Sequence, residues 1–175
     1  MSTAGRTTHE DAPAASEVAA ALRDAGFVRL VARADGESLA ATGILARACS
    51  DAGIPFQASA ARFPNERVPD TDESNDDAAA DAADLVVTVG ASGGDVALAT
   101  APSVTAFDAA DELGADAEPV LALAGVVAGG RTPGTGDCAP LLDAADDRLV
   151  RRPGVAVPTA DLADGLAHST LVHAG

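Results

Sequence analysis

The chain has 175 residues, enough for one domain of ordinary size and too few for a second full domain. Its 27 acidic and 11 basic residues give a net charge of −16, while a hydrophobic fraction of 47% argues against a disordered acidic chain. Residues 1–16 lack the apolar segment of a signal peptide and no apolar run approaches the roughly 20 residues that span a bilayer, so we expect a cytoplasmic protein without a membrane partner.

The hydrophobic pattern divides the chain into three parts. Residues 1–15 are small, polar and prolyl and predict a flexible arm, residues 16–150 an α/β domain, and residues 151–175 a C-terminal extension. Ser16 and Ser38 are the expected caps of the first two helices. In chain order, the pattern predicts a helix at 16–25, a strand at 27–31, a helix at 38–52 and a strand at 56–60. A helix at 78–83, strands at 85–89 and 104–107, and helices at 119–128 and 141–147 follow.

The alternation of strands and helices predicts the fold class. Successive βαβ units build an α/β domain with a doubly wound, mostly parallel sheet. In such sheets ligands bind beyond the carboxyl ends of the strands. We therefore expect the loops that start at Arg33, Gly90 and Asp108 to meet in one crevice.

Three segments at these strand ends carry short motifs. They read VARADGESLAA at residues 31–41, DLVVTVG at residues 84–90 and VTAFDAA at residues 104–110. In order and strand context they resemble the motifs of the DHH phosphoesterase superfamily, and the chain looks closest to its archaeal RecJ-like exonucleases. The resemblance covers roughly residues 27–130 and implies a DHH-type domain without the second substrate domain that usually follows.

The resemblance also implies two divalent metal ions, often Mn²⁺, that activate water for phosphodiester hydrolysis. Carried over onto this chain, it leaves Asp35 and Asp108 as residual metal ligands. The remaining ligand positions are degenerate and are occupied by Arg33, Gly90, Ala109 and Ala110. We therefore expect no cofactor, and Mn²⁺ or Mg²⁺ only where residual activity exists.

Arg33 adds a permanent positive charge to the expected site. Two unit charges about 4 Å apart interact by roughly 4 kcal/mol at an effective dielectric near 20, so the arginine opposes a divalent cation. The simplest expectation is an ion pair of Arg33 with Asp35 and Asp108 in place of the metals. The alternative is purely structural, with Asp35 in a turn, Ser38 as a helix cap and Asp108 as another cap.

Several other features are open to two interpretations. The glycine-rich segment 90–94 can cradle a phosphate, although a plain turn is favoured because it lacks the spacing of a nucleotide fingerprint. The basic cluster of Arg148, Arg151 and Arg152 can contact nucleic acid or form a solvated face. Cys49 and Cys138 are far apart and predict two idle thiols.

Acidity ordinarily argues against nucleic acid as a partner. Here a chain rich in short carboxylates and without lysine fits a cytoplasm at very high salt, where screening shortens to about 3 Å at 1 M. The acidity of the chain therefore does not exclude nucleic acid as a partner.

The leading functional expectation follows from the resemblance. It is a non-catalytic, RecJ-like protein of DNA replication or repair that associates with the replicative helicase and GINS or with single-stranded DNA. The first alternative is an active metal-dependent single-strand exonuclease or small phosphoesterase. The second is a nucleotide-binding regulatory domain that uses the same crevice without hydrolysis.

Overall fold

The computed structural model describes residues 13–64 and 84–150 of the chain. The expected helix at 78–83 and the terminal segments 1–12 and 151–175 lie outside the described residues. In chain order the elements are α1 (Ala15–Asp24), β1 (Phe27–Arg33), α2 (Gly36–Asp51), β2 (Phe56–Ala61), β3 (Asp84–Val89), β4 (Val96–Leu98), α3 (Pro102–Glu112), α4 (Pro119–Ala128), the 3-10 turn η2 (Gly136–Cys138), α5 (Ala139–Ala144) and the 3-10 turn η3 (Asp146–Arg148).

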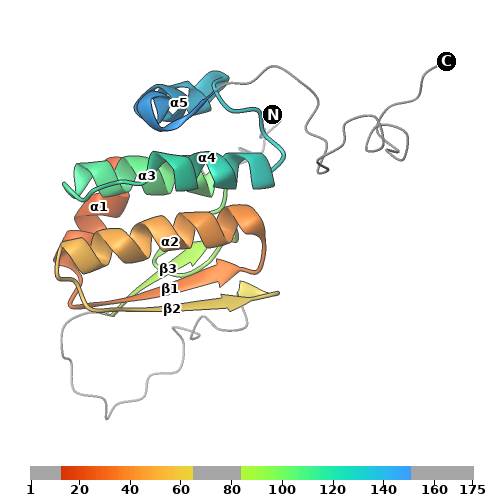
Figure 1. The fold of residues 1–175 in the computed structure, drawn as a ribbon. Coiled ribbons are helices and arrows are strands. Elements are labelled where there is room, and N and C mark those ends of the chain that lie inside the picture. Colours follow the sequence, from red (N-terminus) through yellow and green to blue (C-terminus); the bar gives the residue numbers. More distant parts are fainter. Residues whose placement is uncertain (1–12, 65–83, 151–175) are drawn as a thin grey trace, which may run out of the picture.

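The four strands form one all-parallel sheet in the order β2-β1-β3-β4. Val28 of β1 lies between Phe56 of β2 and Leu85 of β3, which fixes the register of the three longer strands. The helices α2, α3 and α4 lie on one side of this sheet, and α5 packs on α4 (Figure 1). The prediction of a doubly wound α/β fold is confirmed, and the chain reverses its direction across the sheet at β1.

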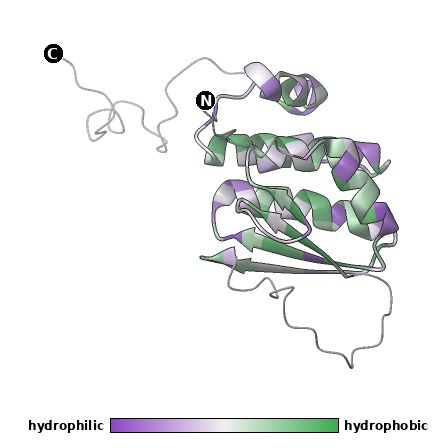
Figure 2. Ribbon diagram, turned by 180° about the vertical axis from the view of Figure 1, so that it is seen from behind, coloured by the Kyte–Doolittle hydropathy of each residue, from purple (hydrophilic) through white to green (hydrophobic). Residues whose placement is uncertain are grey.

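The core lies between the sheet and its helices. Alternate residues of β1 point toward α2, and Val28, Leu30 and Ala32 are all fully buried. Figure 2 shows hydrophobic residues along the strands and along the helices that cover them. The other fully buried large side chains of the described core are Val18, Leu22, Leu45, Cys49, Val87, Thr88, Val89, Leu98, Val126 and Leu141.

The predicted strand at 104–107 is wrong, because these residues belong to α3. Pro102 occupies the first turn of that helix, where its missing N–H has no partner to lose. The buried residues Ala106, Ala109 and Ala110 then recur at helical spacing against the core. A four-residue apolar run does not distinguish a strand from one face of a helix, and the longer pattern decides it.

The strand missed by the sequence pattern is β4, which has only three residues. Parallel neighbours usually need a connection of a dozen residues or more. Here residues 90–95 suffice, because β4 pairs only with the last three residues of β3. Gly90, Gly93 and Gly94 all have positive φ, which allows this tight return.

Hydrogen bonds hold the 90–95 loop against β3. The Thr88 hydroxyl donates to the carbonyl oxygen of Gly93 at 2.5 Å. The Asp95 carboxylate accepts from the backbone N–H of Val86 at 2.8 Å, and the Asp95 N–H donates to the Val86 carbonyl at 2.9 Å. The glycine-rich segment is therefore a fixed part of the sheet edge.

The helix starts differ slightly from those expected. The N-cap of α1 is Ala14, whose backbone N–H donates to the Glu17 carboxylate at 3.1 Å, so Ser16 is not the cap. The N-cap of α2 is Asp35, and Ser38 lies three residues into the helix as the donor to that cap. Aspartate is among the strongest N-caps, so the earlier start agrees with its chemistry. None of the helices in residues 13–64 and 84–150 is both long and apolar enough to cross a membrane.

Candidate functional site

The candidate site lies at the carboxyl edge of the sheet, between β1 and β3. From β1 the chain passes to β2 on one side, and β3 lies on the other side, so this is the switch point of the sheet order. Arg33 ends β1, Asp35 is the N-cap of α2 and Gly90 follows β3. The loops expected to meet at Arg33 and Gly90 do meet there.

Arg33 and Asp35 form the expected ion pair, with the Arg33 Nε donating to the Asp35 Oδ2. Ser38 completes it, since its backbone N–H donates to Asp35 Oδ1 and its hydroxyl to Asp35 Oδ2, each at 3.0 Å. Burial acts to raise the pKa of Asp35, but the hydrogen bonds from Arg33 and Ser38 outweigh it and hold this pKa below its usual value. Both carboxylate oxygens are therefore occupied.

Gly90 packs directly against this pair. It has a φ of +77°, and a Cβ at this position would overlap the Ser38 hydroxyl oxygen and lie 3.3 Å from the Arg33 Cβ. The space in front of residue 90 is thus filled by Ser38. An aspartate cannot stand at position 90 unless Ser38 moves.

Asp108 does not join the site, and this corrects the expectation from the third motif. It lies on α3, and the charged neighbours of its carboxylate are Asp111, Asp137 and Glu112. Burial first, and then these like charges, raise the pKa of Asp108. The ion pair of the site therefore contains Asp35 alone.

Ala109 and Ala110, read from the motif as degenerate ligand positions, are also on α3. They are 0% and 1% exposed and pack in the core. They correspond to no ligand position at the carboxyl edge.

A second arginine–carboxylate pair lies at the start of α2 and was missed by sequence reasoning. The Arg131 Nη2 donates to Glu37 Oε1 at 2.6 Å, and the Arg131 Nη1 to Asp137 Oδ2 at 3.2 Å. Glu37 is 14% exposed and Arg131 is 28% exposed. Burial acts to lower the pKa of Arg131, but the hydrogen bond and charge of Glu37 raise it.

The signals for this pair were the glutamate in the first turn of α2 and the two glycines after α4. A Cβ on Gly129 would overlap the Glu37 carboxylate, so the glycine opens the path that Arg131 uses. Only the three-dimensional packing of α2 against α4 shows that they meet.

The residues at this edge do not fit a pair of divalent cations. Such a pair needs several clustered carboxylate or imidazole ligands. Here the two carboxylates nearest the start of α2, Asp35 and Glu37, are each bound to an arginine. Among the described residues, no group of three or more His, Cys, Asp or Glu side chains could hold a metal ion.

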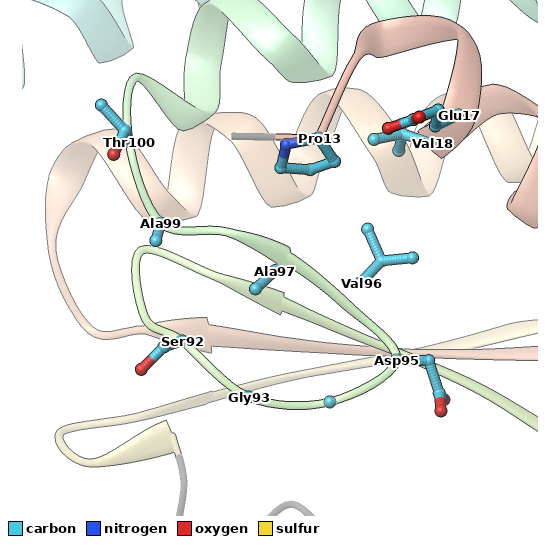
Figure 3. A pocket seen from close by; sticks show the side chains of 11 residues that line it. Pro13, Glu17, Val18, Ser92, Gly93, Asp95, Val96, Ala97, Ala99 and Thr100 are labelled. Atoms are coloured by element: carbon cyan, nitrogen blue, oxygen red, sulfur yellow. The ribbon is translucent and has the colours of Figure 1, made fainter. Parts of the chain in front are cut away.

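The glycine-rich loop lines a cavity of about 510 Å³ on the β4 side of the sheet. Figure 3 shows Pro13, Glu17 and Val18 at the start of α1 facing the loop and β4. The charged side chains that line the cavity are Glu17 and Asp95, both carboxylates. A phosphate would meet two negative charges there, so this loop is a poor phosphate cradle.

The expected basic cluster is only partly described. The two Nη atoms of Arg148 donate to the two carboxylate oxygens of Glu118, at 2.6 and 3.2 Å, which engages its charge within the chain. Arg151 and Arg152 lie outside the described residues.

Cys49 and Cys138 are buried free cysteines, as expected of idle thiols. Burial raises the pKa of Cys49 to about 11.

Comparison with known proteins adds one relative. No protein-family model and no solved structure matches the chain. The chain is 48% identical over 176 residues to the uncharacterized protein rrnAC1427 of Haloarcula marismortui. The match covers 98% of this chain but only 42% of that protein. The name of the relative assigns no activity, so a functional argument has to rest on the residues of this chain.

Proposed function

We propose that this chain is a non-catalytic binding domain of the RecJ-like kind that acts in DNA replication or repair in the cytoplasm. The observation that carries the proposal is the ion pair at the carboxyl edge. Asp35 accepts from Arg33 and twice from Ser38, so its carboxylate is committed to holding the start of α2. A phosphodiesterase of the resembled type would need that carboxylate free for a metal ion.

The packing around the pair supports the same proposal. Ser38 fills the space in front of Gly90, and Asp108 lies on α3 among other acids. A site at the switch point of the sheet whose charged side chains are paired with one another suits binding to another macromolecule. We propose the replicative helicase with GINS, or single-stranded DNA, as the partner, and no need for Mn²⁺ or Mg²⁺.

The second candidate is a nucleotide-binding regulatory domain. The observation in its favour is the 510 Å³ cavity beside the glycine-rich loop. Against it stand Glu17 and Asp95, because both would repel the phosphate groups of a nucleotide.

The decisive experiment measures degradation of labelled single-stranded DNA by the purified chain in molar KCl, with and without Mn²⁺. We expect no degradation, and no binding of Mn²⁺ alone in a calorimetric titration. Recovery of helicase or GINS subunits with the chain from cell extract supports the proposal. Mn²⁺-dependent degradation that is lost in Asp35→Ala but kept in Asp108→Ala would overturn it. Binding of a mononucleotide without either result would favour the second candidate.

A further inference from the structure

The β2 edge of the sheet is an unusual surface for so acidic a protein. Within the described residues β2 pairs only with β1, so its outer backbone edge has no partner strand. Proteins usually protect such an edge with charges, proline or a bulge. The six residues of β2 read FQASAA and offer neither a charge nor a proline.

The neighbouring part of α2 is equally free of acids. Residues 38–50 and 52–64 contain no Asp or Glu, although the chain has 27 of them. Leu39 is 49% exposed on α2, and Phe56 is 36% exposed at the start of β2. In a molecule whose surface is otherwise dense in carboxylates, an apolar, acid-free surface of this kind indicates an interface.

A shallow hollow of about 330 Å³ lies between α2 and β2. Its lining includes Leu39, Gly43 and Ala46 of α2 and Ala58 and Ala60 of β2. Ala58 and Ala60 pair with the buried residues Leu30 and Ala32, so they belong to the helix-covered face of the sheet, yet they are exposed. The helices therefore stop short of covering the outermost strand.

We propose that this surface binds a second copy of the same chain by antiparallel pairing of β2 with β2, which joins the two sheets into one. A two-fold interface requires a surface that is its own complement. A two-fold axis perpendicular to the sheet, lying outside β2 and level with Ser59, places Ser59 opposite its own counterpart and keeps the helices of both copies on the same side. It therefore brings α2 of one copy beside α2 of the other.

The positions of the residues along α2 and along β2 agree with this symmetry. Gly43, Ala58 and Ser59 line the same hollow, and Gly43 lies near the midpoint between Leu39 and Ala46 along α2. Antiparallel helices about that midpoint set Leu39 of each copy against Ala46 of the other. The exposed leucine then fills the hollow of its neighbour, and Gly43 allows the two helices to approach closely.

Charge also favours this contact over others. Two copies of a chain with a net charge of −16 repel each other wherever carboxylates meet. Residues 38–50 and 52–64, which form the centre of this surface, contribute no carboxylate to it. Of its basic residues, Arg47 is already paired with Asp51 and Asp116 of its own chain, and Arg62 lies over the ring of Phe63.

The test measures the mass of the purified chain by light scattering in molar KCl at rising protein concentration. We expect twice the 17.1 kDa of one chain. Leu39→Glu should return it to the mass of one chain, because two buried carboxylates would then face apolar surfaces. Val127→Glu is the matched control, since Val127 is 58% exposed on α4 and lies outside the proposed contact.

A cross-link locates the contact independently of that variant. Ser59→Cys should form a disulfide-linked dimer on mild oxidation, because the two-fold axis brings position 59 near its counterpart. Ser92→Cys, exposed in the glycine-rich loop, should not. The buried Cys49 and Cys138 leave the new thiol as the reactive one. A single-chain mass at every concentration, or a dimer that survives Leu39→Glu and forms no link at position 59, would overturn the proposal.

Discussion

Gly90 has a left-handed backbone conformation, and the space that a side chain at this position would need is already filled. Its φ is +77°, and a Cβ there would overlap the hydroxyl oxygen of Ser38. A side chain in this conformation costs roughly 1–2 kcal/mol, and forcing extra atoms into a packed site adds about 1–3 kcal/mol. We therefore expect Gly90→Ala to lower the free energy of unfolding by about 3 kcal/mol in denaturant titrations at molar salt.

Gly53 provides the control for the conformational part of this cost. Its φ is +69°, but a Cβ there would meet nothing within 4 Å. Gly53→Ala should lower the free energy of unfolding by only about 1 kcal/mol. Equal losses in the two variants would show that Ser38 does not fill the space in front of residue 90.

At the scale of single residues, the sequence predicts only contacts between near neighbours. The Arg33–Asp35 pair was predictable because two residues of opposite charge lie two positions apart at the end of one strand. The Arg131–Glu37 pair joins positions 94 residues apart, and a local sequence pattern does not predict a contact over that separation. The placement of Asp108 failed because it depended on a strand that is a helix.

The start of α2 is the element that connects the candidate site to the rest of the fold. The helices α2 and α4 approach each other closely at two points. A Cβ on Gly36 would lie 2.8 Å from the Cβ of Ala128, and a Cβ on Gly125 would lie 2.9 Å from the Cβ of Ala40. These glycines let α2 and α4 pack at short distance. The Glu37–Arg131 pair then joins the start of α2 to the loop after α4.

This arrangement predicts unequal effects for two arginines. Arg131→Ala leaves the mostly buried Glu37 carboxylate without its charged donor, which should lower the free energy of unfolding by about 2 kcal/mol. Arg148→Ala breaks a pair whose arginine is 50% exposed, and should cost less than about 1 kcal/mol. Chemical denaturation of both variants in the same buffer gives the comparison. A larger loss in Arg148→Ala would contradict the structural role assigned to Arg131.

At the scale of elements, prediction depended on the length of each hydrophobic pattern. The strands β1, β2 and β3 and the helix α2 were predicted because each pattern extends over five residues or more. β4 has three residues and its position depends on the hydrogen bonds of the glycine-rich loop. The conformation of that loop depends on hydrogen bonds to the assembled sheet, so composition alone does not predict it.

The whole molecule carries more negative charge than its ion pairs can balance. The chain has 27 acidic residues and 11 arginines, which leaves a net charge of −16 however the ion pairs are arranged. Folding brings these charges closer together and raises their mutual repulsion. At about 1 M salt the screening length is about 3 Å, which confines this repulsion to immediate neighbours.

The free energy of unfolding should therefore increase steeply with salt. We expect it to fall by several kcal/mol between molar and millimolar KCl at neutral pH, a large share of the roughly 5–15 kcal/mol that stabilises an ordinary domain. Circular dichroism during denaturant titrations at a series of KCl concentrations measures the change. The dependence should shrink as the pH is lowered toward the pI of about 4.2, because the net charge then vanishes. A salt dependence that is equally steep at both pH values would show that the chloride salt acts on apolar hydration rather than on charge repulsion.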